Sequence, residues 1–307
     1  MERSGNGDLV IETHGLTKRY GNLVAVDGLT MRVHPGEVYG FLGPNGAGKT
    51  TTLRMLLGLV RPSAGSASVL GMRPGSSEGL AGVGALIESP GFYPFLSARD
   101  NLRVMAAHAG VDAERASVVL DEVGLGDRAN DRYGNYSQGM KQRLGIASAL
   151  LKDPDVLILD EPTIGLDPKG MAGMRTFIRE LGSGRRAVLL SSHLMSEVEH
   201  VCDRVGVINR GVLVKEGTVD ELRGRRSLIV RATPTEQANR VLEGLPEASG
   251  IRVQDDVFTV TADPASAATI NRALVEAGVA VSELRSQRAS LEEVFLGLTN
   301  DDEEGSR

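Results

Sequence analysis

The sequence predicts an α/β protein built on a parallel β-sheet, followed by a smaller α+β domain. Short apolar runs at 156–159, 187–190 and 205–208 alternate with stretches of helical spacing, which is typical of a parallel sheet covered by helices. A buried strand at 38–42 runs into a glycine-rich loop and then into a helix. After residue 226 the strand and helix patterns follow the order β-α-β-β-α-β, which is the ferredoxin-like arrangement.

Composition excludes several classes of protein. The 307-residue chain is 41% hydrophobic and 24% charged, as expected for a globular protein with a real core. Its formal charge of −6 argues against binding nucleic acid or anionic lipid by general electrostatic attraction. Cys202 is the only cysteine, so an internal disulfide framework and a cysteine-built metal site are excluded, and a reducing cytoplasm fits best. No window approaches the roughly 20 apolar residues of a membrane span.

The chain divides into segments of different character. The first domain begins with two strands, 9–17 and 23–33, which we expect to form an antiparallel layer around the turn at Gly21 and Asn22. We expect a helix from Thr51 to Leu59 and a mostly helical insertion at 97–151. The expected segments are a disordered start at 1–7, the first domain at 8–222, the second domain at 225–299 and a solvated acidic tail at 300–307.

The second domain is predicted element by element. Its strands and helices are separated by turn residues, and a hairpin crosses Asp256. The expected elements are strand 227–232, helix 235–245, strands 251–255 and 257–262, helix 265–277, strand 279–285 and a last short helix 291–298.

A phosphate-binding loop lies between the buried strand and the helix that follows it. The segment Gly43–Thr50 matches the phosphate-loop pattern, in which glycines turn successive backbone N–H groups toward a phosphate at a helix N-terminus. Lys49 is expected against the β- and γ-phosphates, and the hydroxyl of Thr50 on Mg²⁺. The residues expected to bind the phosphates are Gly43, Pro44, Asn45, Gly46, Ala47, Gly48, Lys49, Thr50 and Thr51.

Two carboxylates follow a second buried strand. The apolar run 156–159 ends in Asp160 and Glu161, which places both at the sheet edge where ligands bind in such folds. Asp160 is expected to hold the water shell of Mg²⁺. Glu161 is then the candidate base, because phosphoryl transfer needs an oriented nucleophile and charge neutralisation.

A third motif identifies a family. The segment Asn135–Arg143 resembles the signature sequence of the ATP-binding-cassette (ABC) ATPases, and it stands just before Asp160, as in that family. The resemblance implies that Ser137 and Gly139, at a helix start, contact the γ-phosphate of ATP held by an opposite subunit. It therefore implies a dimer of cassettes with ATP sandwiched between two copies.

Other positions match the family in order. Tyr20 corresponds to the aromatic residue that stacks on adenine. Asp167, in the loop Ile164–Asp167, corresponds to the segment that crosses the dimer interface. His193 resembles the switch histidine that contacts the γ-phosphate, so the catalytic set implied is Lys49, Glu161 and His193.

Two departures from the family pattern narrow the resemblance. Glu88 stands where the family usually has a glutamine, and its carboxylate is expected to hold Mg²⁺ or its water, so the metal set is Thr50, Asp160 and Glu88. Met140 stands at the signature position where glutamine is commonest in the family. Both changes resemble antibiotic-export and antibiotic-immunity ATPases of the bacitracin-resistance and daunorubicin-exporter type, and the second domain resembles their C-terminal extension.

The resemblance implies the ATP-hydrolysing subunit of an exporter, docked on the cytoplasmic face of a separately encoded membrane permease. A soluble ABC ATPase acting on ribosomes or DNA ends is the alternative, although the second cassette or the long coiled coil of those proteins is missing. A nucleotide sensor without turnover is disfavoured by the presence of Glu161 and His193. The aromatic cluster at 90–95 either packs inside the helical insertion or receives a membrane helix, and both readings stay open.

Overall fold

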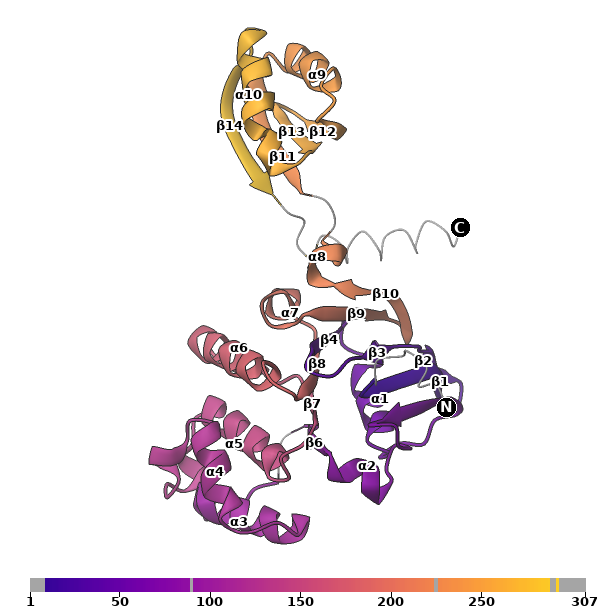
Figure 1. The fold of residues 1–307 in the computed structure, drawn as a ribbon, viewed down its shortest axis with the longest axis vertical. Coiled ribbons are helices and arrows are strands. Elements are labelled where there is room, and N and C mark those ends of the chain that lie inside the picture. Colours follow the sequence, from indigo (N-terminus) through magenta and orange to yellow (C-terminus); the bar gives the residue numbers. More distant parts are fainter. Residues whose placement is uncertain (1–8, 89–90, 224–225, 288–290, 293–307) are drawn as a thin grey trace, which may run out of the picture. The chain divides into compact units, whose positions relative to one another are not determined.

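The computed structural model describes residues 9–88, 91–223, 226–287 and 291–292 (Figure 1). The chain forms two compact units that divide between Val219 and Asp220. Each unit has its own hydrophobic core. The predicted disordered start, most of the last helix and the acidic tail lie outside the described residues.

The first unit is organised around a six-stranded sheet. All neighbouring strands run parallel except β10, which is antiparallel to β9. In spatial order the strands are β10 (Val212–Thr218), β9 (Arg204–Asn209), β4 (Val38–Leu42), β8 (Ala187–Ser192), β7 (Val156–Asp160) and β6 (Val83–Leu86). The four apolar runs expected as strands are confirmed. Strands β6 and β10 are not predicted from the sequence, because β6 has only four residues and β10 is half polar.

The centre of this sheet is buried on both faces. Every residue of β4 and β8 is buried, as are the first four residues of β7, because helices or the antiparallel layer cover both sides. The parallel register pairs Leu42 with Ser192 and Asp160 with Ser191. The carboxyl ends of β4, β7 and β8 therefore meet at one edge, where doubly wound sheets bind their ligands.

An antiparallel layer packs against α1 (Lys49–Leu56) and one face of the central sheet. Here one expectation is wrong and one strand was not expected. The single strand expected at 23–33 is divided into β2 (Leu23–Gly28) and β3 (Arg32–Val33), which pair with successive parts of β1 (Ile11–Tyr20). A further strand, β5 (Ala64–Val69), pairs with the other edge of β1. It was missed because its residues are small and mostly exposed, so they carry no apolar alternation.

Helices fill the connections between the strands. The expected helical insertion at 97–151 contains α3, α4 and α5, together with two short 3₁₀ turns at Gly126–Arg128 and Tyr133–Asn135. In the sequence it lies between β6 and β7 (Figure 1). Helix α1 ends at Leu56, before the expected Leu59. The remaining helices of this unit and its insertion are α2 (Ser77–Ala81), α3 (Ala98–Ala109), α4 (Arg115–Glu122), α5 (Gln138–Leu150), α6 (Pro168–Gly182) and α7 (Met195–Val201). In the described ranges no helix is long and apolar enough to cross a bilayer.

The second unit has the predicted ferredoxin-like order. After α8 (Val219–Leu222), which straddles the division, its sheet runs β12-β13-β11-β14 with every pair antiparallel. Both helices pack on that sheet through apolar residues such as Leu242 and Leu274. Its elements are β11 (Ser227–Thr233), α9 (Thr235–Glu243), β12 (Ser249–Gln254), β13 (Val257–Thr261), a 3₁₀ turn (Pro264–Ser266), α10 (Ala267–Glu276) and β14 (Ala280–Gln287).

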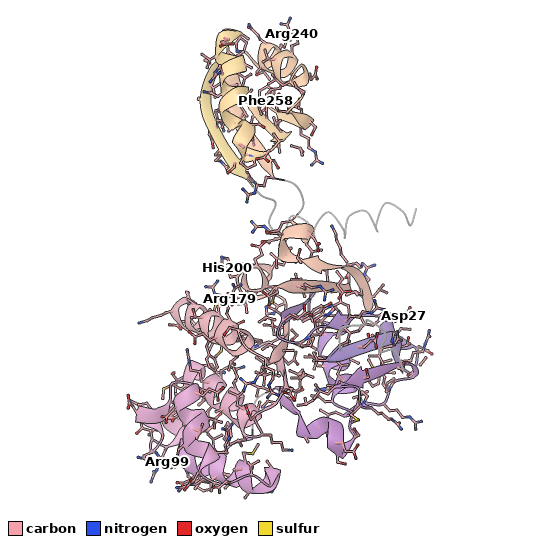
Figure 2. All side chains as sticks on the ribbon, in the orientation of Figure 1. Asp27, Arg99, Arg179, His200, Arg240 and Phe258 are labelled. Carbon is pink, nitrogen blue, oxygen red and sulfur yellow. The ribbon has the colours of Figure 1, made fainter. Side chains whose placement is uncertain are left out.

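Phe258 is the largest fully buried side chain of the second unit (Figure 2). Phe258→Ala should lower the free energy of unfolding of this unit by about 3–5 kcal/mol, which is a large part of the stability of so small a core. In the full chain we expect backbone amides of β11 and β13 to lose protection in hydrogen exchange, while those of β4 keep theirs. Val253→Ala, at an exposed site on β12, is the control and should change neither. Loss of protection in β4 would contradict two separate cores.

Candidate functional site

The loop between β4 and α1 can only be made with glycine at two positions. Gly48 has φ of 107°, and a Cβ there would lie 2.4 Å from the carbonyl oxygen of Ala25. A Cβ on Gly43 would lie 2.3 Å from the carbonyl oxygen of Ile208. The loop is thus pressed between β2 and β9, and no side chain could be accommodated at these two points.

Lys49 is the first residue of α1 and is 6% exposed. Its ammonium group donates to the carbonyl oxygens of Gly43, at 2.6 Å, and Pro44, at 3.2 Å. Gly48 caps the helix without a side-chain hydrogen bond, so no side chain occupies the N-terminal amides of α1. A buried cation beside free amides and the positive end of a helix dipole is an anion-binding arrangement.

Thr50 and Asp160 meet at the mouth of the loop. The Thr50 hydroxyl donates to Asp160 Oδ2 at 2.8 Å, and the Ser191 hydroxyl donates to Asp160 Oδ1. Hydroxyl and carboxylate oxygens are the hard ligands that Mg²⁺ prefers, and Mg²⁺ usually takes only one or two from protein. This pair fits such an ion, with its other positions left to water and phosphate.

Glu161 lies between the cation and the histidine. Its Oε1 is 3.2 Å from Lys49 Nζ, and its Oε2 is 2.8 Å from Nδ1 of His193. Its backbone has φ of 47°, a left-handed conformation uncommon outside glycine, and its N–H donates to the Ser191 hydroxyl at 3.0 Å. Such strain is typical of functional sites, because the surroundings must hold the residue in place.

A pocket of about 360 Å³ opens along these groups. It has Tyr20 at its rim and the phosphate loop and Glu161 along its wall, and the Lys18 ammonium lies 4.8 Å from the Tyr20 ring centre. Tyr20 is 47% exposed, which leaves a face of the ring free for stacking. The pocket is lined by Tyr20, Leu23, Ala25, Pro44, Asn45, Gly46, Gly48, Lys49, Thr50, Thr51, Glu161 and Ile164. Its size and chemistry suit a nucleoside triphosphate.

The signature residues are placed on other elements. Ser137 caps α5 by accepting from the Met140 N–H at 3.3 Å, and Gly139 lies in the first turn of that helix. Asp167 caps α6 by accepting from the Gly170 N–H at 2.9 Å. Of the described residues that line the Lys49 pocket, none is Ser137, Gly139 or Asp167. One copy of the chain therefore brings together Lys49, Thr50, Asp160, Glu161 and His193, but not the signature group.

Glu88 is the expected metal ligand that the structure leaves apart from Thr50 and Asp160. It has φ of 63°, its side chain is 65% exposed, and its carboxylate pairs with Arg54 on α1. Within the described part of the chain its carboxylate makes no hydrogen bond to Thr50, and no group of three His, Cys, Asp or Glu side chains there has metal-binding geometry. Its assignment as a metal ligand stays a prediction.

Ser191 is the functional residue that sequence reasoning missed. Its hydroxyl donates to the Asp160 carboxylate and accepts from the backbone N–H of Glu161, so one residue orients the first carboxylate and holds the backbone that carries the second. It lies two residues before His193, which is the residue of this segment that the sequence predicts to act in the site. The signal was its place at the end of a strand adjacent to β7, which only the strand order reveals.

A phosphate loop at the end of a central parallel strand, a lysine buried in it and a carboxylate pair at the end of a nearby strand define a P-loop nucleoside triphosphatase. The family model described as ABC transporter matches residues 26–164, and relatives match along almost the whole chain. The chain belongs to the ABC transporter family and is an ATP-binding ATPase whose activity is coupled to transport.

Two curated relatives and one solved structure illustrate the similarity. The bacitracin transport ATP-binding protein of Bacillus licheniformis is 41% identical over 94% of this chain and 97% of its own. A daunorubicin resistance ATP-binding protein of Streptomyces coeruleorubidus is 37% identical over 96% and 97%. A solved ATP-binding subunit of an ABC transporter superposes with a TM-score of 0.62 at 30% identity, over 70% of this chain and 92% of that one.

Gly48→Ala tests the loop. The added methyl group meets the Ala25 carbonyl as well as an unfavourable φ, so the loop must shift. We expect the affinity for ATP to fall at least about tenfold, equivalent to about 1.4 kcal/mol, in a nucleotide titration. Gly110→Ala, which has φ of 68° but nothing within 4 Å of the new Cβ, should keep wild-type affinity. Equal affinity in the two variants would contradict the packing argument.

Proposed function

We propose that this chain is the ATP-hydrolysing subunit of an exporter of antibiotic or drug-like molecules, acting with a separate membrane permease from the cytoplasmic face. The observation that carries the dimeric part of this proposal is the division of the site. One helix N-terminus with a hydroxyl, at Ser137, lies outside the pocket that holds Lys49 and Glu161. A second copy of the chain would supply that group to close the pocket over ATP.

The first half-site accounts for phosphate binding and water activation. Lys49 and the amides at the start of α1 would neutralise the β- and γ-phosphates, and Thr50 and Asp160 would hold Mg²⁺. When bound, Mg²⁺ supplies charge neutralisation on the phosphate oxygens. Glu161 Oε2 would accept a proton from the attacking water. His193, within 2.8 Å of that oxygen, would orient the carboxylate and contact the γ-phosphate.

The second half-site accounts for the mechanical output. The Ser137 hydroxyl and the N-terminal amides of α5 would bind the γ-phosphate held by the other copy. ATP would then favour the closed dimer, and loss of the γ-phosphate would remove the contact. A permease that binds the open and closed dimers differently would be driven between two states.

The proposed export substrate class follows the relatives. One is named for bacitracin transport and another for daunorubicin resistance, and both match across nearly their full lengths. A nucleic-acid partner is not proposed, since the net charge is −6.

The permease would dock beside the start of the helical insertion. Phe92, for which both readings were open, is 8% exposed and packs edge-on against Tyr133 with ring centres 5.1 Å apart, so it belongs to the core. Tyr93 and Phe95 are 49% and 67% exposed and lie 5.7 Å apart between their ring centres. This exposed aromatic pair supports docking of an apolar membrane-protein helix.

Glu161→Gln tests both the chemistry and the dimer. Loss of the base should lower the rate of ATP hydrolysis by about 100-fold or more, because an amide cannot accept the proton. With saturating ATP and Mg²⁺, the variant should accumulate as a closed dimer in light-scattering mass measurements. Adding Ser137→Arg should abolish that dimer without changing the first half-site. A variant that stays monomeric even with its permease would overturn the sandwich.

Phe95→Ala tests docking. Removal of an exposed aromatic anchor should weaken permease binding by about 1–2 kcal/mol and reduce drug efflux in cells, with the hydrolysis rate of the isolated subunit unchanged. Phe92→Ala is the comparison, since deletion of a buried ring should instead lower the melting temperature. Equal losses of efflux and isolated hydrolysis from Phe95→Ala would count against docking there.

A further inference from the structure

His193 is joined rigidly to the helix that follows it. The N–H of Leu194 donates to the Ser192 hydroxyl at 3.0 Å, and the N–H of Glu197 donates to the Leu194 carbonyl at 3.2 Å. The first bond spans His193 and the second lies directly after it, so the backbone between His193 and the first turn of α7 has little freedom to move. Any displacement of α7 therefore moves the imidazole relative to Glu161.

One side of α7 rests against β4. A Cβ on Gly40 would lie 2.7 Å from Val198 Cγ1 and 2.8 Å from Cys202 Sγ, so the helix sits as close to the strand as a glycine allows. This contact is apolar and prevents α7 from moving toward the sheet. Helix α7 also packs against α6.

The other contact is an ion pair with α6. Glu197 is 5% exposed, and its Oε1 is 3.5 Å from Nη1 of Arg175. Its Oε2 is buried and has no hydrogen-bond partner in the part of the chain that the structure describes. A buried carboxylate costs stability unless it is paired, so Arg175 is what makes this position tolerable. Arg179 and His200, labelled in Figure 2, line the outer side of the same helix pair with Arg175.

Helix α6 carries the other end of the connection. It begins at Pro168, directly after Asp167, the expected dimer-interface residue, whose side chain caps it. Arg143 of α5 donates to the Gly173 carbonyl at 3.3 Å and stands over the Phe177 ring at 5.1 Å. Helix α6 thus contacts the signature helix on one side and, through Arg175, the helix after His193 on the other.

We propose that the Arg175–Glu197 ion pair positions His193 against Glu161 and ties that position to α6, which begins at the dimer interface. Neither residue lines the nucleotide pocket, so both are positioning residues. The pair sets α7 along α6, and the rigid turn after His193 transmits that setting to the imidazole. This inference rests on the proposed role of His193 in hydrolysis.

The experiment uses the full chain with Glu197→Gln and, separately, Arg175→Gln. Each should lower kcat for ATP hydrolysis by about tenfold or more with KM within about twofold, because ATP binding is untouched while the base is misoriented. The double variant should be no worse than the worse single one, since both remove the same contact. Glu197→Gln removes the buried charge, so it still gives a folded protein to test if Arg175→Gln, which leaves that charge unpaired, does not fold.

Glu37→Gln is the matched control. Glu37 is 9% exposed, pairs with Arg204 at 3.3 Å and precedes β4 at the end of that strand remote from the phosphate loop. Burial raises the pKa of both Glu37 and Glu197, so the two substitutions neutralise carboxylates in similar surroundings. Glu37→Gln should leave kcat within about twofold of wild type, whatever it does to the melting temperature.

A His193→Ala background separates positioning from a general structural effect. There, Glu197→Gln should have no further effect on the single-turnover rate, because it acts through the missing imidazole. A further loss of about tenfold in that background, or a kcat of Glu197→Gln within about twofold of wild type, overturns the inference. If His193→Ala itself leaves hydrolysis unchanged, the proposed function has failed at that residue, which is a different result.

Discussion

The parallel register of β4, β8 and β7 is the constraint on which the site depends. It pairs Leu42 with Ser192 and Asp160 with Ser191, so three strands from distant parts of the chain end side by side. Each strand then delivers one component: the phosphate loop, the histidine loop or the carboxylate pair. Because both faces of these strands are buried, a one-residue slip would turn each side chain into packing that fits another, and it would also separate the groups of the site.

Charge within this edge is arranged so that each buried group has a partner. Glu161 lies between Lys49 and His193, and Asp160 accepts hydrogen bonds from two hydroxyls. Burial of such groups without partners would cost several kcal/mol each. The interactions that offset the cost of burying these charges also orient the side chains. A bound ligand can therefore replace some of these contacts without a change of fold. Ser191 is an example, because its one hydroxyl holds both the Asp160 carboxylate and the backbone of Glu161.

The helices after the motifs connect events that are chemically separate. Helix α5 starts at the signature serine, α6 starts at Asp167, and α7 follows His193. Arg143 joins α5 to α6, and Arg175 with Glu197 joins α6 to α7. In the proposed dimer, closure at Ser137 and Asp167 would therefore change the position of His193 through the packed helices. Chains of rigid elements with few contacts between them are suited to such transmission.

Local pattern by itself determined the buried strands, the phosphate loop, the carboxylate pair and the ferredoxin-like order, because glycine turns, apolar runs and helix caps act over a few residues. Strand order and side-chain partners depend on contacts between distant residues. Only the tertiary structure therefore divided the strand expected at 23–33, added β5 along β1, paired Glu88 with Arg54, buried Phe92 against Tyr133 and brought Ser191 to Asp160. Each of these outcomes is a contact between segments that are far apart in the chain, and the local sequence of one segment does not specify which other segment it contacts.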